Sequence, residues 1–375
     1  MQIGVPAETI AGETRVAVTP ETAKKLIAQG HQVSVQSGAG AAASAPDQAY
    51  IQVGAQVVDA ASAWGADLVL KVAPATAPEL AGMRAGATLV GMLDPFDADG
   101  LQRMAQAGIT AFALEAAPRT TRAQSMDVLS SQANIAGYKA VMLAANEYGR
   151  FFPMLMTAAG TVKAARVVVL GVGVAGLQAI ATAKRLGAVI EASDVRPSVK
   201  EQVESLGGKF IDVPYETDEE REAAEGVGGY AKPMPPSWLA RQQAEVAKRV
   251  AMADVVITTA LIPGRAAPTL VSEDMVQSMK PGSVVVDLAA GRGPNRRDGN
   301  CRVTQAGQTV QVAGVHVVGL TNLAAQVPAD ASALYARNVL DFLKLIVSAD
   351  GVKIDMEDDI VAACLVARDG VVTRS

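Results

Sequence analysis

One glycine-rich stretch limits the folds open to this chain more than any other feature. A β-branched run, Val167–Leu170, leads into three glycines in the spacing G-x-G-x-x-G: Gly171, Gly173 and Gly176. In that spacing the first glycine allows a tight turn, the second lets a pyrophosphate approach bare backbone, and the third lets the next helix pack close to the strand. The helix, expected to begin near Ala175, would point its free N–H groups at the phosphates. The stretch predicts a strand, a phosphate-binding turn and a helix.

The residues after the glycines support a dinucleotide site over an ordinary glycine-rich turn, which is the alternative. Apolar residues at helical spacing precede Gly187, which can end the helix, and a second strand over 188–192 leads to Asp194. A carboxylate there would bind the 2′-hydroxyl of the adenosine ribose and repel a 2′-phosphate, so NAD(H) is favoured over NADP(H). Arg196 is expected to face solvent at a helix start.

Composition narrows the class of protein. The chain has 375 residues, 50% of them hydrophobic and only 4% aromatic, and 34 glycines, which suits two parallel α/β domains. A net charge of −5, without a basic patch, argues against nucleic-acid binding. Cys301 and Cys364 match no metal or disulfide pattern, so we expect no metal site and a reducing compartment. Without a signal peptide or membrane span, we expect a cytoplasmic chain.

Alternating strand and helix patterns predict two doubly wound, Rossmann-like parallel-sheet lobes with a nucleotide cleft between them. The first lobe is expected at 1–130 and 325–375, and the nucleotide domain at 131–324. The strands expected in the first lobe are 3–5, 32–36, 67–72, 88–93 and 110–114, with helices at 20–28, entered by Thr19 as N-cap, and 97–107. In the second, strands are expected near Val167, Ala188, Lys209, Asp254, Ser283 and Val315.

Other segments are predicted with less regular patterns. A helix over about 131–150 is expected to cross between the lobes, and another over 330–346 precedes a hairpin formed by 360–367 and 371–372. Residues 214–236, acidic and then rich in glycine and proline, have no clear pattern. They are interpreted as a functional flap, with a disordered surface insertion as the alternative.

The polar stretch 118–134 is the densest group of functional side chains. It would face the edge of the sheet where ligands bind in open α/β folds, or would simply be a helix-entry loop capped by Asp127 or Ser130. Neither histidine, His31 or His316, lies beside other polar groups at a strand end, so both are expected to be structural. The chain therefore offers a nicotinamide site without an obvious proton-transfer residue.

Several long segments resemble the NAD(H)-binding component of proton-translocating nicotinamide nucleotide transhydrogenases: 122–127, 129–134, 156–162, 171–188, 200–210 and 258–264. The resemblance, which spans nearly the whole chain, implies an enzyme of the Si/Re-specific class. Such enzymes transfer hydride from NADH to NADP⁺ bound on a partner subunit, coupled to proton translocation by a membrane-spanning subunit. It also implies a homodimer associated peripherally with the cytoplasmic side of the inner membrane through its partner subunits.

The same resemblance implies roles for individual residues. Those matching the loop that holds the nicotinamide and its ribose are Arg119, Arg122, Gln124, Asp127 and Ser130. Those matching the pyrophosphate and adenosine site are Gly171, Gly173, Val174, Gly176 and Asp194, and those lining the cleft are Thr259, Ala260 and Leu261. Tyr230 would lie at the tip of a mobile loop. Direct hydride transfer moves no proton at the reacting carbon, which explains the missing general base.

Two alternatives remain. Arg15 and Lys71 lie in segments similar to the substrate arginine and catalytic lysine of alanine dehydrogenases, but the strand 89–93 lacks their histidine and the loop after Asp287 lacks their aspartate. That loop, 291–300, also departs from the Gly-Gly-Asn usual in transhydrogenases. The second alternative is a non-catalytic NAD-binding module.

Overall fold

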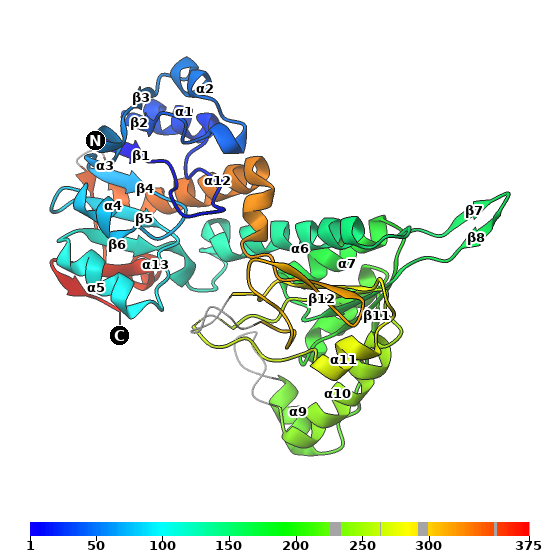
Figure 1. The fold of residues 1–375 in the computed structure, drawn as a ribbon. Coiled ribbons are helices and arrows are strands. Elements are labelled where there is room, and N and C mark those ends of the chain that lie inside the picture. The colour runs from blue at the N-terminus through cyan, green and yellow to red at the C-terminus, as the bar shows by residue number, and fades with distance from the viewer. Residues whose placement is uncertain (226–233, 263, 292–298, 349–350, 375) are drawn as a thin grey trace. The chain divides into compact units, whose positions relative to one another are not determined.

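The computed structural model describes residues 1–225, 234–262, 264–291, 299–348 and 351–374. These residues form two compact units. The first comprises 1–132 and 324–375, and the second comprises 133–323 (Figure 1). Helix α6 (Val128–Glu147) begins in the first unit and continues into the second. Both units are α/β, so the predicted fold class is confirmed.

The first unit is built on a sheet to which the described residues contribute eight strands, in the order β19-β18-β6-β5-β4-β1-β2-β3. Strands β1 to β6 pair in parallel, whereas β18 and β19 add antiparallel at the edge next to β6. The strands are β1 Gln2–Val5, β2 Gln32–Gln36, β3 Gln56–Val58, β4 Leu68–Leu70, β5 Thr88–Gly91, β6 Thr110–Ala113, β18 Leu365–Arg368 and β19 Val371–Val372. A separate short hairpin joins β16 Val347–Ser348 to β17 Gly351–Val352.

Helices cover this sheet through their apolar faces. They are α1 Pro20–Ala28, α2 Asp47–Gln52, α3 Ala60–Trp64, α4 Ala77–Ala81, α5 Ala98–Gln106, α12 Pro328–Ile346 and α13 Asp359–Cys364, with 3₁₀ turns η1 Ala41–Ala43, η2 Leu114–Ala116 and η3 Gln124–Met126. The long helix α12 packs on the sheet, with the ring of Phe342 edge-on to Phe112 at 5.5 Å. Thr19 caps α1 as predicted, with Pro20 in the first turn.

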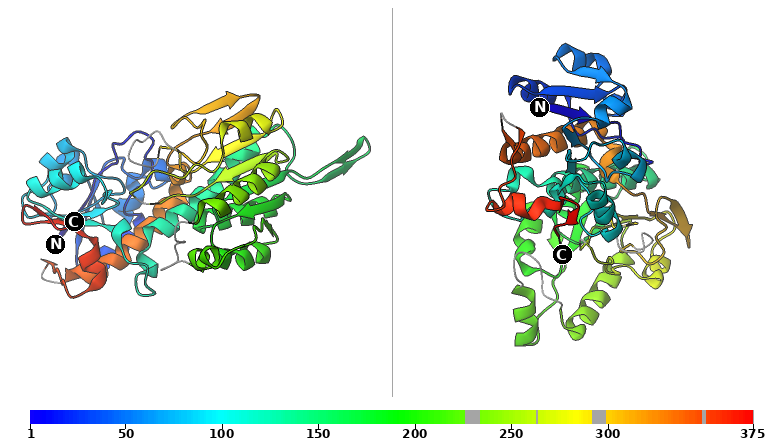
Figure 2. Two further views of the ribbon diagram at one scale, coloured as in Figure 1. Left: turned by 90° about the horizontal axis from the view of Figure 1, so that it is seen from below. Right: turned by 90° about the vertical axis from the view of Figure 1, so that its left-hand side faces the viewer.

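The second unit has a sheet in the order β11-β10-β9-β12-β13-β15-β14, parallel except for β14. Its strands are β9 Arg166–Leu170, β10 Val189–Ser193, β11 Lys209–Phe210, β12 Val255–Thr258, β13 Val284–Asp287, β14 Thr309–Val312 and β15 Val315–Val318. Its further helices are α7 Val174–Arg185, α8 Lys200–Ser205, α9 Asp218–Glu225, α10 Pro236–Val250 and α11 Glu273–Ser278, with 3₁₀ turns η4 Pro197–Val199 and, at the junction with the first unit, η5 Leu323–Gln326. A hairpin of β7 Leu155–Thr157 and β8 Gly160–Val162 stands clear of this sheet (Figures 1 and 2).

Both sheets share one topology. When the parallel strands of each unit are numbered in chain order, both read 3-2-1-4-5-6, the doubly wound order of dinucleotide-binding folds. Strands 1 and 4 are therefore neighbours in each unit, β1 with β4 and β9 with β12. Their chains then lead to opposite sides of the sheet, which leaves a crevice at their carboxyl ends where ligands bind in such folds.

The structure corrects three local predictions. The hairpin near the C-terminus begins only at Leu365, because Asp358 caps a helix by accepting the N–H groups of Ile360 and Val361. The acidic start of the segment 214–236 is helix α9, whose Glu220 pairs with Arg241 of α10 at 2.7 Å. Arg196 is only partly exposed, because its guanidinium pairs with Asp194, as described below. Within the described residues no helix has the length and apolarity to cross a bilayer.

The buried carboxyl group of Glu115 should make the unfolding free energy of the first unit depend on pH. Its carboxylate lies at the end of β6 and accepts the N–H groups of Leu93, at 3.1 Å, and Asp94, at 2.7 Å. Burial raises its pKa from 4.5 to about 7. The folded state then binds more protons than the unfolded state between these values, so stability present at low pH is lost as the pH rises, by about 3 kcal/mol in all.

We therefore expect Glu115→Gln to flatten the fall in unfolding free energy between pH 4.5 and 7, measured by urea unfolding at several pH values. The exposed Glu357→Gln is the matched control in the same unit and should keep the wild-type slope. An unchanged slope in Glu115→Gln would show that this carboxyl does not titrate in that range.

Candidate functional site

The glycine turn after β9 has the geometry of a phosphate loop. Gly171 adopts a φ of +92°, and a Cβ on it would lie 2.8 Å from Thr259 Oγ1. A Cβ on Gly176 would lie 2.0 Å from the carbonyl oxygen of Gly171, so α7 packs directly on the turn. Contacts within the chain thus account for these two glycines. At Gly173 no described atom lies within 4 Å of the Cβ position, and this open backbone is what a pyrophosphate needs.

The start of α7 leaves donors available for an anion. Gly173 is its N-cap residue, and no side chain of the described residues caps the helix. Thr19, Asp59 and Ser272 each accept a backbone N–H at the starts of α1, α3 and α11, whereas α5 and α10 lack a side-chain cap, as α7 does. A helix N-terminus has unpaired N–H groups and the positive end of the helix dipole. These residues therefore fit a dinucleotide pyrophosphate at the first turn of α7.

The end of β12 meets the glycine turn. The backbone N–H of Thr259 donates to Leu170 O at 2.9 Å, and its hydroxyl donates to Gly171 O at 2.8 Å. The following residue, Ala260, has its carbonyl held by Asn300 Nδ2 at 2.8 Å, and Leu261 is exposed. Residues 259–261 therefore lie at the crevice between the first and fourth parallel strands of the second unit.

Asp194, which follows β10, is bound on both carboxylate oxygens. Its Oδ2 accepts the N–H of Val172 at 2.7 Å, so it ties the end of β10 to the glycine turn. Arg196 donates to both oxygens, with Nε to Oδ1 and Nη2 to Oδ2 both at 3.0 Å, and Nη2 also contacts Val172 O. Arg196 stands at a helix start as predicted, just before η4, but its side chain is half-buried because the nearby carboxylate draws its guanidinium back over the turn. A ribose hydroxyl would have to share Asp194 with this arginine.

The polar loop of the first unit is also built on an ordered turn. Gln124 is exposed on η3, while its neighbours Ala123 and Met126 are buried in the core. Asp127 caps α6 by accepting the N–H of Ser130 at 2.9 Å and its hydroxyl at 2.5 Å. The alternative interpretation of Asp127 as a helix cap is therefore confirmed, though a cap can still bind a ligand. Arg119 is exposed on the same loop.

Arg122 is held within the first unit. Its guanidinium makes a two-pronged pair with Asp358, at 2.6 and 2.7 Å, and also contacts Asp359. This pairing lowers the pKa of Asp358 to about 2. The contacts fasten the loop to the start of α13, so in this structure Arg122 acts as an anchor of the loop.

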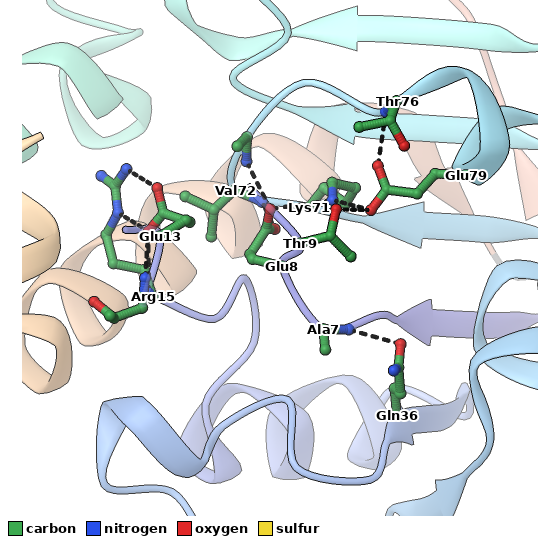
Figure 3. A network of polar contacts seen from close by, with 12 residues as sticks. Ala7, Glu8, Thr9, Glu13, Arg15, Gln36, Lys71, Val72, Thr76 and Glu79 are labelled. Carbon is green, nitrogen blue, oxygen red and sulfur yellow. Dashed lines mark hydrogen bonds and ion pairs between the residues drawn. The ribbon is translucent and has the colours of Figure 1, made fainter. Parts of the chain in front are cut away.

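The crevice of the first unit is filled by ion pairs (Figure 3). Lys71, fully buried at the end of β4, lies 3.1 Å from both Glu8 and Glu79. Burial raises the pKa of Glu8; for Glu79, burial also acts upward, but the N–H of Thr76 and the charge of Lys71 bring its pKa below the usual value. Arg15, also buried, pairs with Glu13 at 2.6 Å. The two residues that resemble an amino-acid substrate site are therefore paired with the chain's own carboxylates.

Two buried residues of the second unit, Asp287 and Asn300, were not identified from the sequence as organising the site. Asp287, at the end of β13, accepts bonds from Thr258 Oγ1, Thr304 Oγ1 and Cys301 N and so organises three segments near the crevice. Asn300 binds two carbonyls, those of Ala260 and Pro268. A single acidic residue ending an apolar run was the only signal for Asp287. The predictions for Tyr230 and for residues 292–298 fall outside the described residues.

Neither histidine belongs to the glycine turn or to the polar loop that carries Gln124. His31 is buried after α1, and desolvation lowers its pKa. His316 Nδ1, on β15, lies 3.5 Å from Glu147 of α6. Among the described residues no group of three or more His, Cys, Asp or Glu side chains is placed to hold a metal ion.

Comparison with known proteins decides the family. Residues 4–136 match the model "Alanine dehydrogenase/PNT, N-terminal domain", and residues 140–375 match the C-terminal domain of the same name. The chain belongs to the alanine dehydrogenase/PNT family. It is 50% identical to the first part of the NAD(P) transhydrogenase alpha subunit of Rhodospirillum rubrum, over 100% of this chain and 98% of that protein.

Members from both branches of the alanine dehydrogenase/PNT family resemble the chain. The crystal structure of a transhydrogenase from Sinorhizobium meliloti has a TM-score of 0.89 and 48% identity, covering 99% of this chain and 100% of that one. Alanine dehydrogenase of Bacillus subtilis is 28% identical over 100% of this chain and 93% of its own length. The higher identity places the chain with the transhydrogenase alpha subunits.

The glycine turn gives a matched pair of variants. A methyl group at Gly176 would collide with backbone, so Gly176→Ala should lower the unfolding free energy by about 1–3 kcal/mol. Gly173→Ala meets no described atom and should change stability by no more than about 0.5 kcal/mol, yet weaken NADH binding by obstructing the phosphates. Urea unfolding and NADH titration separate the two effects. Wild-type affinity in Gly173→Ala would argue against a pyrophosphate at this turn.

Proposed function

We propose that this chain is the NAD(H)-binding component of a proton-translocating transhydrogenase. In this role it would deliver hydride from NADH to NADP⁺ on a partner subunit. The observation that carries the proposal is the uncapped first turn of α7 on the glycine turn, in a chain 50% identical along its length to an NAD(P) transhydrogenase alpha subunit. This geometry supports NAD(H) as the bound nucleotide, because Asp194 carries a carboxylate at the end of β10.

The proposed roles divide between the two domains predicted from the sequence. Residues 131–324 form the NAD(H)-binding domain, in which the pyrophosphate and adenosine are held by Gly171, Gly173, Val174, Gly176 and Asp194. Residues Thr259, Ala260 and Leu261 line the dinucleotide cleft. Residues 1–130 and 325–375 form the other lobe, whose loop positions the nicotinamide and ribose through Arg119, Gln124, Asp127 and Ser130. Arg122 is also part of this nicotinamide-binding loop. We assign Tyr230 to the loop that closes over the nucleotide.

Direct hydride transfer between two nicotinamide rings requires the rings to be held in fixed positions relative to each other. The donor and acceptor carbons must be held about 3–3.5 Å apart in line, and water must be excluded. No proton moves at the reacting carbon, so the chain needs hydrogen-bonding groups that orient the carboxamide and ribose. The amide of Gln124, exposed on a turn whose neighbours are buried, is suited to this work.

Amino-acid oxidation is less well supported. A substrate carboxylate would need Arg15 or Lys71, and both already pair with buried carboxylates. Opening such a pair leaves a buried charge uncompensated, which costs about 3–5 kcal/mol.

The proposal includes partners that no contact in this structure shows. We propose that the chain acts as a homodimer in the cytoplasm. It would associate peripherally with the inner membrane through the NADP(H)-binding and membrane-spanning subunits, which would couple hydride transfer to proton translocation.

The deciding experiment measures hydride transfer from NADH to an NADP⁺ analogue, with and without a purified NADP(H)-binding transhydrogenase component. Transfer should appear only when the second component is present, and Gln124→Ala should slow it more than it weakens NADH binding. Oxidation of alanine by the chain alone would identify an amino-acid dehydrogenase. NADH binding without either reaction would leave a non-catalytic module.

Asp194 and Arg196 make a second test, of nucleotide selectivity. Asp194→Ala removes a charged acceptor, so NADH should bind on the order of tenfold to a hundredfold more weakly, with discrimination against NADPH reduced. Arg196→Ala is the matched variant: it frees the same carboxylate from its cation and should sharpen the discrimination. Titrations of both nucleotides check this. Equal selectivity in all three proteins would remove Asp194 from ribose recognition.

A further inference from the structure

Helix α12 presents a row of buried polar side chains to the loops at the carboxyl edge of the first sheet. Ser332 Oγ accepts the N–H of Val16, in the loop after β1, at 3.0 Å. One turn later the hydroxyl of Tyr335 donates to Lys71 O, at the end of β4, at 2.6 Å. Another turn on, Asn338 reaches the loop after β6. A single helix thus holds three loops at defined positions along its axis.

Asn338 contacts the C-terminal end of the loop after β6 and the start of the helix that follows it. Its Nδ2 donates to the carbonyl of Ser125, within η3, at 2.7 Å, and its Oδ1 accepts the hydroxyl of Ser131, in the first turns of α6, at 2.7 Å. The carbonyl of Ser125 can only accept a hydrogen bond, so the nitrogen of the Asn338 amide must face it. The oxygen of the same amide then faces the hydroxyl of Ser131. Gln124 and Asp127 lie on the loop that these two contacts hold.

The hydrogen bonds around Asn338 continue through Ser131 to the buried side chain of Gln132. The amide of Gln132 donates to Ser131 Oγ, at 3.2 Å, and to Ala331 O of α12, at 3.1 Å. The carbonyl oxygen of the same amide accepts Arg15 Nη1 at 2.8 Å. Buried hydrogen-bond networks with all members satisfied hold one geometry strongly, because an unmade bond there is costly. Arg15 therefore has a role in this network that requires no substrate.

We propose that Asn338 is a positioning residue for hydride transfer, acting through the carbonyl of Ser125 to hold the turn that carries Gln124. This inference rests on the function proposed above. In that function the exposed side chains of the turn would contact the nucleotide, whereas Asn338, 8% exposed and on a different helix, holds the loop through its buried contacts. A displacement of about 1 Å in a positioning group can slow a reaction about a hundredfold, with little effect on affinity set elsewhere.

The test compares Asn338→Ala and Asn338→Asp with Arg337→Gln in the full chain. The aspartate keeps the shape and the acceptor for Ser131, but it replaces the donor to Ser125 by an oxygen that faces the carbonyl, so it breaks the contact with η3 while the contact with α6 can remain. Arg337→Gln alters the adjacent residue of α12, which pairs with the exposed Glu21 of α1, and is the control. For each protein we would measure NADH affinity, single-turnover hydride transfer with the NADP(H)-binding component, and the rate of tryptic cleavage after Arg119 and Arg122.

Both Asn338 variants should transfer hydride on the order of tenfold or more slowly, keep NADH affinity within about threefold, and be cut faster in the loop. Arg337→Gln should match the wild type in all three measurements. Wild-type transfer and cleavage in Asn338→Asp, or the same slowing in Arg337→Gln, would overturn the inference. Absence of transfer in the wild type itself would instead show failure of the proposed function, and with it of any role for Asn338 in that reaction.

Discussion

The ion pair of Lys71 with Glu8 and Glu79 closes the crevice of the first unit, and much of the chain's functional division depends on it. Both units have the same parallel strand order, so each has a crevice where its first and fourth strands diverge. In the second unit this crevice has an uncapped helix start and open backbone at Gly173. In the first it has two carboxylates around one buried ammonium. The same topology thus leaves backbone donors available at the crevice of one unit, whereas the charged groups at the crevice of the other are paired with one another.

The charged cluster around Lys71 does more to fix one arrangement of its loops than to increase the free energy of unfolding. Burying charges costs several kcal/mol per ion, and paired charges regain roughly that amount, so a buried cluster adds little to the free energy of folding while strongly penalising any other arrangement. Glu8 also accepts the N–H of Val72 at 2.6 Å, so the loop after β1 is tied to the end of β4. Tyr335, whose pKa is raised by burial, binds the carbonyl of Lys71. The cluster therefore fixes loops as well as charges, and α12 extends that order to the loop that carries Gln124.

The sequence was sufficient where local patterns decide structure. Buried β-branched runs such as Val167–Leu170 and the Thr19–Pro20 helix start carry their own signals, and both were predicted correctly. The three-residue strand β3 and the antiparallel edge strand β14 are short or alternate in burial, and they were missed. Residues whose partners are distant in sequence were also beyond reach. Asn338 binds Ser125, 213 positions away, and no spacing rule connects them.

Asp194 shows how recognition and loop shape become coupled. Its position after β10 is evident from the sequence, but its four acceptor contacts are not: two come from the guanidinium of Arg196, which folds back, and one comes from the backbone N–H of the same residue. The fourth, from Val172, lies inside the glycine turn itself. A ligand hydroxyl that draws this carboxylate toward itself must therefore also act on the glycine turn, where we propose that the pyrophosphate binds. Adenosine recognition and phosphate binding would then share one side chain, so a nucleotide with the wrong ribose would be penalised at both.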